Sequence, residues 1–176
     1  MKNKISLSLF GLCLGTQLVA QAPFTCTEAL EICGSNSVLI DYPEAYTETP
    51  TAIAEDCSGP FPTFFALDSN IVWLKLAFET SGEFYFTLDP VDPEDDLDFV
   101  VFEAPMGDCS ELVAARCMYS GENIGAPSSQ CLGATGLAPG STDLAEGPGC
   151  SAGDDNFLAP IEVEAGAIVY VLVASW

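Results

Sequence analysis

The sequence predicts an all-β fold: a disulfide-stapled antiparallel β-sandwich of jelly-roll type, after a cleaved signal peptide. Short apolar runs alternate with clusters of Pro, Gly, Asp and Ser, which is the pattern of sandwiches and barrels. The chain has 176 residues, eight cysteines and a hydrophobic fraction of 49%, with 11 Phe. This composition excludes a disordered chain despite a formal net charge of −22. The length predicts a single domain.

The first twenty residues have the layout of a secretory signal peptide. Lys2 and Lys4 form a basic start, an apolar run follows over residues 5–14, and the small Ala20 precedes the expected cleavage point. The apolar run is shorter than the roughly 20 residues that span a bilayer. We therefore expect residues 1–20 to be removed and residues 21–176 to form the sandwich module.

The signal peptide predicts an extracellular or cell-surface location. Cys13 raises the alternative of a lipoprotein, but Phe10 and Leu12 precede it where a lipoprotein signal has Leu and a small residue. No later stretch of the sequence has the length and apolarity that predict a membrane span.

The segments that follow the signal peptide give weak signals. Residues 27–32 are compatible with one helical turn inside a loop bounded by cysteines. Residues 38–40 and 63–67 are short apolar runs that we expect to be strands.

The clearest strand covers residues 71–78, where apolar side chains alternate between two faces. Residues 82–88 repeat the alternation, with Phe84, Phe86 and Leu88 facing inward. Because only the turn 79–82 separates the two runs, we expect them to pair as a hairpin.

Three further strands are expected at residues 97–103, 161–164 and 168–174. The last is apolar on both faces, which predicts a central position. Residues 120–160 are rich in Gly, Ser and Pro, and we expect a long loop pinned by its two cysteines. Since the apolar run at 169–176 stops without a following partner, we expect the module to lack its last strand.

Seven cysteines follow the signal peptide, and in an exported protein they indicate disulfides. A zinc site is the rival interpretation, but the sequence has no C-x-x-C motif and no His. Local pairing would join Cys26 with Cys33, Cys109 with Cys117, and Cys131 with Cys150, leaving Cys57 over. The order of pairing does not follow from sequence, so other connectivities stay open.

The net negative charge of residues 21–176 limits the kinds of partner that this protein can bind. Once residues 1–20 are removed, Lys75 and Arg116 are the only cations beside all 26 acidic residues, a formal charge of −24. Such a surface repels nucleic acid and anionic membranes, because their phosphates bind Lys and Arg. It attracts cations or basic partners, although solubility is an equally good explanation of the charge.

Residue types also weigh against an enzyme. Without His there is no Ser-His-Asp triad and no Cys-His pair. A G-x-S-x-G match at residues 149–153 follows a Gly/Pro-rich stretch rather than a strand, so we interpret it as chance. Two carboxylates could cleave glycosides, but among 26 acidic residues some pair will be close by chance.

Two acidic segments are candidate calcium ligands. Residues 89–98 hold six acids in ten positions, and a second cluster follows at residues 154–156. Ca²⁺ takes six to eight oxygen ligands and suits such loops. The alternative is that Asp95, Asp96 and Asp98 are solvated or cap nearby backbone N–H groups. The candidate ligands are Asp92, Asp95, Asp96, Asp98, Asp154, Asp155 and Asn156.

Aromatic residues suggest a second kind of site. Trp73, Tyr85, Phe64 and Phe65 could form a carbohydrate platform, and Trp73 and Tyr85 would lie on the same outward face of the expected hairpin. Core packing against a second sheet is the commoner position of such residues.

Several motifs together resemble a known family. They are C-x2-A-L-x2-C at residues 26–33, V-W-L at 72–74, D-D-L-D-F-V-V-F at 95–102, C-L-G-A-T-G-L at 131–137 and D-N-F at 155–157. With the apolar run at 161–173, they resemble the amino-terminal β-sandwich module of secreted Bacteroidetes proteins that carry gliding-motility-associated or type IX secretion domains at the carboxyl end. A looser similarity is to pre-peptidase carboxy-terminal jelly-roll domains.

The resemblance implies export to the cell surface or medium and does not imply catalysis. Together with the residues, it leads us to expect a binding or structural module for adhesion or assembly. The expected partners are a surface glycan, a protein ligand or further domains of the same polypeptide, and the acidic segments make Ca²⁺ the one candidate cofactor. The alternative is a carbohydrate-binding accessory domain of a larger secreted enzyme. Family members continue past residue 173 to another strand, which supports the expectation of a missing last strand.

Overall fold

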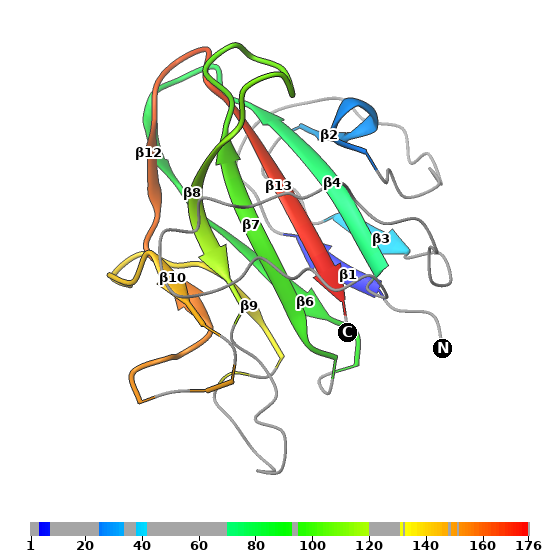
Figure 1. Ribbon diagram of the computed structural model, residues 1–176, viewed down its shortest axis with the longest axis vertical. Coiled ribbons are helices and arrows are strands. Elements are labelled where there is room, and N and C mark those ends of the chain that lie inside the picture. The colour runs from blue at the N-terminus through cyan, green and yellow to red at the C-terminus, as the bar shows by residue number, and fades with distance from the viewer. Residues whose placement is uncertain are drawn as a thin grey trace.

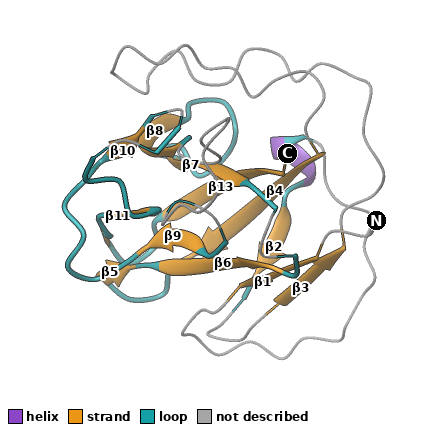
Figure 2. Cartoon of the chain, turned by 90° about the horizontal axis from the view of Figure 1, so that it is seen from below, coloured by secondary structure: helices purple, strands orange, loops and turns teal. Residues whose placement is uncertain are grey.

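The protein is seen in a computed structural model that describes residues 4–7, 25–33, 38–41, 70–92, 95–119, 131, 133–147, 149–150 and 152–175. The described chain is built of β-strands, with one 3-10 turn, η1 (Cys26–Glu28). The strands form two sheets that face each other, with a short ribbon at one side (Figure 1, Figure 2). The predicted all-β fold is therefore confirmed.

The larger sheet has six strands in the order β10-β8-β7-β13-β4-β2. Their bounds are β2 (Leu30–Ile32), β4 (Asn70–Ala77), β7 (Leu97–Glu103), β8 (Val113–Met118), β10 (Ala145–Glu146) and β13 (Ile168–Ser175). The central strands are antiparallel, and the short edge strands β2 and β10 pair in parallel with their neighbours.

The facing sheet has five strands in the order β11-β9-β6-β1-β3. Their bounds are β1 (Lys4–Leu7), β3 (Val38–Asp41), β6 (Phe86–Pro90), β9 (Thr135–Leu137) and β11 (Phe157–Leu158). The ribbon pairs β5 (Gly82–Phe84) with β12 (Ile161–Val163). The five-stranded sheet contains β1, which lies inside the segment predicted to be a signal peptide.

Strand β13 occupies the centre of the larger sheet, as its two apolar faces predict. It pairs antiparallel with β4 on one side and with β7 on the other, over nearly its whole length. Val169, Val171 and Val173 face the second sheet, while Tyr170, Leu172 and Ala174 join an apolar cluster on the opposite face. Both faces are buried, which explains the absence of polar alternation in this segment.

The main core lies between the two sheets. Alternate residues of β4, among them Val72, Leu74 and Leu76, meet Phe86 and Leu88 of β6. Phe86 and Phe99 pack edge to face with ring centroids 5.2 Å apart. At about 25 cal/mol per Å² of buried apolar surface, this interdigitated layer is the main source of stability.

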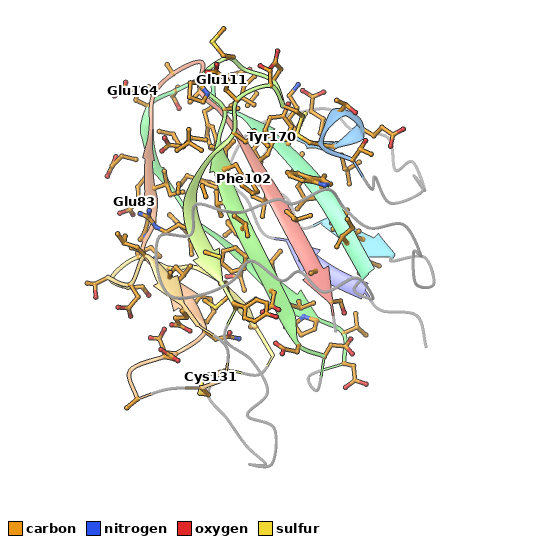
Figure 3. The ribbon with its side chains drawn as sticks, viewed as in Figure 1. Glu83, Phe102, Glu111, Cys131, Glu164 and Tyr170 are labelled. Carbon is orange, nitrogen blue, oxygen red and sulfur yellow. A yellow bond between two sulfur atoms is a disulfide. The ribbon has the colours of Figure 1, made fainter. Side chains whose placement is uncertain are left out.

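The outer face of the larger sheet carries a second apolar cluster. Trp73 of β4 stacks on Phe102 of β7 with ring centroids 5.7 Å apart, and Tyr170 lies beside them (Figure 3). Cys26 and Cys109 pack against this cluster. The six-stranded sheet is thus buried on both faces over these residues.

The predicted hairpin between residues 71–78 and 82–88 is wrong, because these two segments do not pair with each other. Strand β4 pairs with β13 and β2, whereas β5 pairs with β12, so the turn after β4 passes from one sheet to another. The turn runs beside the β12–β13 connection: Phe78 N–H donates to the carbonyl of Ala167, and Ser81 Oγ donates to Glu164 at 2.9 Å. Local alternation predicts a strand's faces, but it carries no information about its partner.

Residues 82–88 form two strands rather than one, because the run is interrupted at the exposed Tyr85. The inward positions of Phe84, Phe86 and Leu88 are confirmed by their burial. The predicted strands at 38–40, 97–103, 161–164 and 168–174 correspond to β3, β7, β12 and β13. The predicted strand at 63–67 lies outside the described residues.

The expected long loop at 120–160 contains three short strands, β9, β10 and β11. Strand β9 approaches β6 very closely, because a Cβ at Gly136 would collide with the backbone carbonyl oxygen of Phe86. A glycine inside a strand is a known sign of such close approach. Strand β8 was also missed, since its mixed sequence V-A-A-R-C-M lacks period-two alternation.

The predicted helical turn at 27–32 is half right. Residues 26–28 form η1, but Leu30–Ile32 extend into β2, which pairs in parallel with β4.

Candidate functional site

Two acidic segments that are far apart in the sequence meet where β7 begins and β8 ends. The sheet register sets Phe99 of β7 opposite Met118 of β8, and Met118 beside Glu146 of β10. Strand ends on three neighbouring strands therefore share this end. We call it the acidic end, defined by Asp92, Asp95, Asp96, Asp98, Glu146, Asp154 and Asp155.

The first part of the acidic end is the β6–β7 connection. The backbone N–H of Asp95 donates to the carbonyl of Asp92 at 3.0 Å, which brings the two residues together in a turn. Burial, and then the neighbouring charge of Asp92, raise the pKa of the Asp95 carboxyl above its usual range. Both causes disfavour a second negative charge there.

Asp98 and Tyr119 are neighbours at the point where β7 begins and β8 ends. Asp98 is only 3% exposed, although it precedes a run of buried apolar residues. Burial raises the pKa of the Tyr119 phenol, and the negative charges of Asp98 and Asp96 raise it further. Three oxygen-bearing side chains thus interact electrostatically at this corner.

The second part of the acidic end is organised by Glu146, which is 3% exposed. Its carboxylate accepts hydrogen bonds from the backbone N–H groups of Asp155 at 3.1 Å and Asn156 at 3.2 Å. Its backbone carbonyl accepts from Tyr119 N–H at 3.0 Å. Glu146 therefore joins the two acidic segments, and sequence reasoning missed it because a single Glu in a Gly-rich stretch gives no pattern.

Asn156 holds the turn in place. Its φ of 69° is the left-handed conformation, which Asn tolerates better than most residues. Its side-chain amide donates to the carbonyl of Ala134 at 3.0 Å, and its own carbonyl accepts from the hydroxyl of Thr135 at 2.8 Å. These buried contacts give Asn156 a structural role where the sequence suggested an ion ligand.

The Cys131–Cys150 disulfide lies at the same end and was predicted from local spacing. In Figure 3 Cys131 lies at the lower end of the sandwich, and Glu111 and Glu164 lie at the opposite end. Cys131 Sγ also lies 3.8 Å from the backbone carbonyl oxygen of Asp154. The bond fixes the segment that carries Asp154 and Asp155.

The other predicted pairings are wrong. Cys26 bonds to Cys109 across 83 residues of sequence, which ties η1 to the loop before β8. Spacing suggested local pairs, but the fold brings these two distant segments together on the outer face of the larger sheet. Cys33 has an exposed side chain and Cys117 is disulfide-bonded, while Cys57 lies outside the described residues.

The candidate calcium ligands do not converge into one cage within the described residues. No group of three or more His, Cys, Asp or Glu side chains in that part of the chain has an arrangement that could hold a metal ion. Asp155 is exposed, and its Oδ1 accepts a hydrogen bond from Phe157 N–H at 3.1 Å. Asp155 therefore caps a backbone N–H group at the start of β11. Glu94, in the middle of the first acidic run, lies outside the described residues.

Trp73 and Tyr85 do not form a shared platform for a sugar. Trp73 is 2% exposed in the outer-face cluster, whereas Tyr85 is 44% exposed on the other side of the sandwich, between β5 and β6. The expectation depended on the β4–β5 hairpin, which the structure replaces by a crossing between sheets. Phe64 and Phe65 lie outside the described residues.

The two basic residues of the larger sheet are engaged elsewhere. Lys75 Nζ lies 3.8 Å from the carboxylate of Glu31. The Arg116 guanidinium donates to the carbonyl oxygens of Ala159 at 2.7 Å and Pro160 at 2.5 Å. Burial lowers the pKa of this guanidinium, and nearby Glu103 opposes that shift.

Comparisons of the chain with family models, curated proteins and solved structures give no match. In the part of the chain that the structure describes, no helix is long and apolar enough to cross a membrane.

Proposed function

We propose that this chain is an exported binding or structural module that acts in adhesion or assembly at the cell surface. The observation that carries the proposal is the pair of disulfides on an all-β sandwich, Cys26–Cys109 and Cys131–Cys150. Structural disulfides form and persist in oxidising compartments and are rare in the cytosol. The signal-peptide layout of residues 1–20 supports the same compartment.

The acidic end is the proposed binding surface of the module. It displays several partly exposed carboxylates on loops that a disulfide and the buried Glu146 hold in place. A rigid scaffold that presents loops is a common arrangement for binding. Its chemistry suits a basic segment of a partner. The described carboxylates do not form a preformed cage, so the Ca²⁺ that we propose as its stabilising ion has to gather its oxygen ligands on binding.

The second candidate is a carbohydrate-binding accessory domain. The observation in its favour is Tyr85, which is exposed in the break between β5 and β6. One exposed aromatic ring gives a smaller stacking surface than the expected pair, because Trp73 is buried. The surface module is therefore the better supported function.

The experiment begins with the full chain expressed in a bacterial host with an oxidising periplasm. We expect the periplasmic protein to begin at Gln21, and a non-reducing peptide map to contain the Cys26–Cys109 and Cys131–Cys150 disulfides and a linked Cys117. The purified protein is then applied to a glycan array and to a panel of basic peptides. Binding of basic peptides that 0.5 M salt weakens is the expected result, because screening shortens the Debye length to below about 5 Å.

A cytoplasmic, reduced product that keeps residues 1–20 would contradict the proposal of export. Binding to a glycan that Tyr85→Ala abolishes, with Tyr85→Phe as the matched control, would favour the accessory domain instead.

A further inference from the structure

Strand β1 lies in the interior of the five-stranded sheet, between β6 and β3 (Figure 1, Figure 2). It pairs antiparallel with β3 at four positions and with β6 at three. Within the described residues, β3 is joined to the sheet through β1. Residues 4–7 therefore complete a ladder that would otherwise have a gap.

The same four residues belong to the segment that the proposed export would remove. Cleavage after Ala20 would leave β6 and β3 two strand spacings apart, about 10 Å, each with one row of backbone N–H and C=O groups without a partner. Such edges bind extended chains by strand addition. This step rests on the proposed export.

The register of β1 with β6 and β3 shows which positions of a strand between them face the core. Residues directly opposite each other in an antiparallel pair lie on the same face of the sheet. Leu88 and Pro90 of β6 are buried, and they lie opposite positions 7 and 5 of β1 respectively. Ile40, which is 5% exposed, also stands opposite position 5. An incoming strand therefore needs apolar residues at two alternate positions.

The intervening positions belong to the outer face. Leu39 and Asp89 are exposed and stand opposite position 6, and Asp41 stands opposite position 4. With a formal charge of −24 on residues 21–176, basic residues are favoured at these outer positions. The sequence of β1, K-I-S-L, has this pattern of polar and apolar residues.

We propose that the exported module binds an extended segment of a second polypeptide between β6 and β3, antiparallel to both. The segment carries apolar residues opposite Leu88 and Pro90 and a basic residue at an outer position. Its backbone supplies the ladder hydrogen bonds, and its alternate side chains supply specificity.

The test uses the full chain with a protease site inserted between Ala20 and Gln21. The folded protein is cleaved and passed over a size-exclusion column. The probe is a fluorescein-labelled peptide with the sequence of residues 2–9, and its binding to the cleaved module is measured by fluorescence anisotropy. We expect the peptide to bind saturably with a Kd below about 1 mM. Co-elution of the cleaved segment 1–20 with the module would be the same interaction, made without a covalent link.

Matched peptides and variants separate strand addition from simple charge attraction. A peptide with Asp in place of Ile5 and Leu7 should bind at least about tenfold more weakly, because it puts charge on the core side. Asp89→Lys in the module should weaken the basic peptide about two- to fivefold. Glu83→Lys makes the same charge change on the exposed β5 ribbon, away from β1, and should leave the affinity unchanged.

Three results would overturn the proposal. The first is a lack of saturable peptide binding together with protection of β6 amides from hydrogen exchange, which means that β3 has closed onto β6. The second is a dimer of the cleaved module, which means that a second copy fills the gap. The third is an affinity for the Asp-substituted peptide equal to that for the peptide of residues 2–9. Recovery of the exported chain with residues 1–20 still attached would instead contradict the proposed signal peptide, and peptide binding by the cleaved protein would remain a separate result.

Discussion

The carboxylate of Glu146 accepts a hydrogen bond from the backbone N–H of Asn156 at 3.2 Å, and both residues are only 3% exposed. The contact joins β10 to the turn before β11. It also places a negative charge against two consecutive N–H groups, because Asp155 N–H donates to the same carboxylate. The acidic end thus depends on a buried acid that itself is not available to a ligand.

Replacing Glu146 by Ala should lower the free energy of unfolding by about 1–3 kcal/mol, because the buried N–H of Asn156 and the part-buried N–H of Asp155 lose their acceptor. Urea denaturation at pH 7 measures the loss. Glu162→Ala, at an exposed position of β12, is the control and should change the value by less than about 0.5 kcal/mol. Equal effects of the two substitutions would mean that the Glu146 hydrogen bonds contribute little.

The Cys26–Cys109 and Cys131–Cys150 disulfides should differ in how much they stabilise the fold. In the chain-entropy model, a bond that closes 83 residues stabilises by roughly 4–5 kcal/mol and one that closes 19 by roughly 3 kcal/mol. The double variant Cys26→Ser/Cys109→Ser should therefore unfold at a lower urea concentration than Cys131→Ser/Cys150→Ser.

The exposed Cys33→Ser serves as the control for the disulfide series and should be close to the parent protein. A larger loss for the Cys131–Cys150 pair would show that local strain or packing outweighs loop entropy at these sites.

A strand could be predicted from the sequence wherever its own residues have a clear hydrophobic pattern. The alternation at 71–78 and the double apolar face of 168–174 predicted β4 and β13 and the central place of β13. Partner choice did not follow, because the β4–β5 turn has the length of a hairpin and yet crosses between sheets. Pairing is decided by the whole core, which no local window contains.

The candidate site was predictable in part. Asp92, Asp95, Asp96 and Asp98 lie at the same end of the sandwich as Asp154 and Asp155, but Glu146 and Tyr119 were missed. Glu146 belongs to the two-residue strand β10, and Tyr119 follows β8, whose sequence does not alternate, so neither residue stands in a recognisable pattern. Cys26–Cys109 was missed for the same physical reason, since distant segments meet only when the sheets pack.

Calcium should raise the melting temperature if the acidic end binds it. An ion at a hundredfold excess over its Kd adds about 2.7 kcal/mol to the free energy of unfolding. Differential scanning fluorimetry in millimolar Ca²⁺ against a chelator measures the shift, and Asp95→Asn/Asp96→Asn should reduce it. Asp143→Asn/Glu162→Gln removes the same charge elsewhere. An unchanged melting temperature in Ca²⁺ would contradict the proposal.

The Tyr119 phenol should titrate above its usual pKa of 10, because of burial and of Asp98 and Asp96. A phenol whose folded pKa is raised keeps its proton longer when folded than when unfolded. Its contribution to stability is therefore complete below about pH 10 and is lost as the pH rises through the folded pKa. Absorbance at 295 nm, compared between the parent and Tyr119→Phe, isolates the titration.

Asp96→Asn should lower the pKa of Tyr119, since it removes one of the two negative charges, and Asp108→Asn is the distant control. If Asp96→Asn leaves the titration of Tyr119 where it was, the carboxylate does not act on the phenol.

Arg116 should be less replaceable than the other basic residue of the sheet. Its guanidinium bridges β8 to the carbonyls of Ala159 and Pro160 with a fixed fork of donors, which the single ammonium of Lys does not reproduce. Arg116→Lys should lower the free energy of unfolding by about 1–3 kcal/mol. Lys75→Met, which removes the exposed pair with Glu31, should cost at most about 1 kcal/mol. Urea denaturation of both variants decides the order, and an Arg116→Lys protein as stable as the parent would show that the carbonyls find water as readily as the guanidinium.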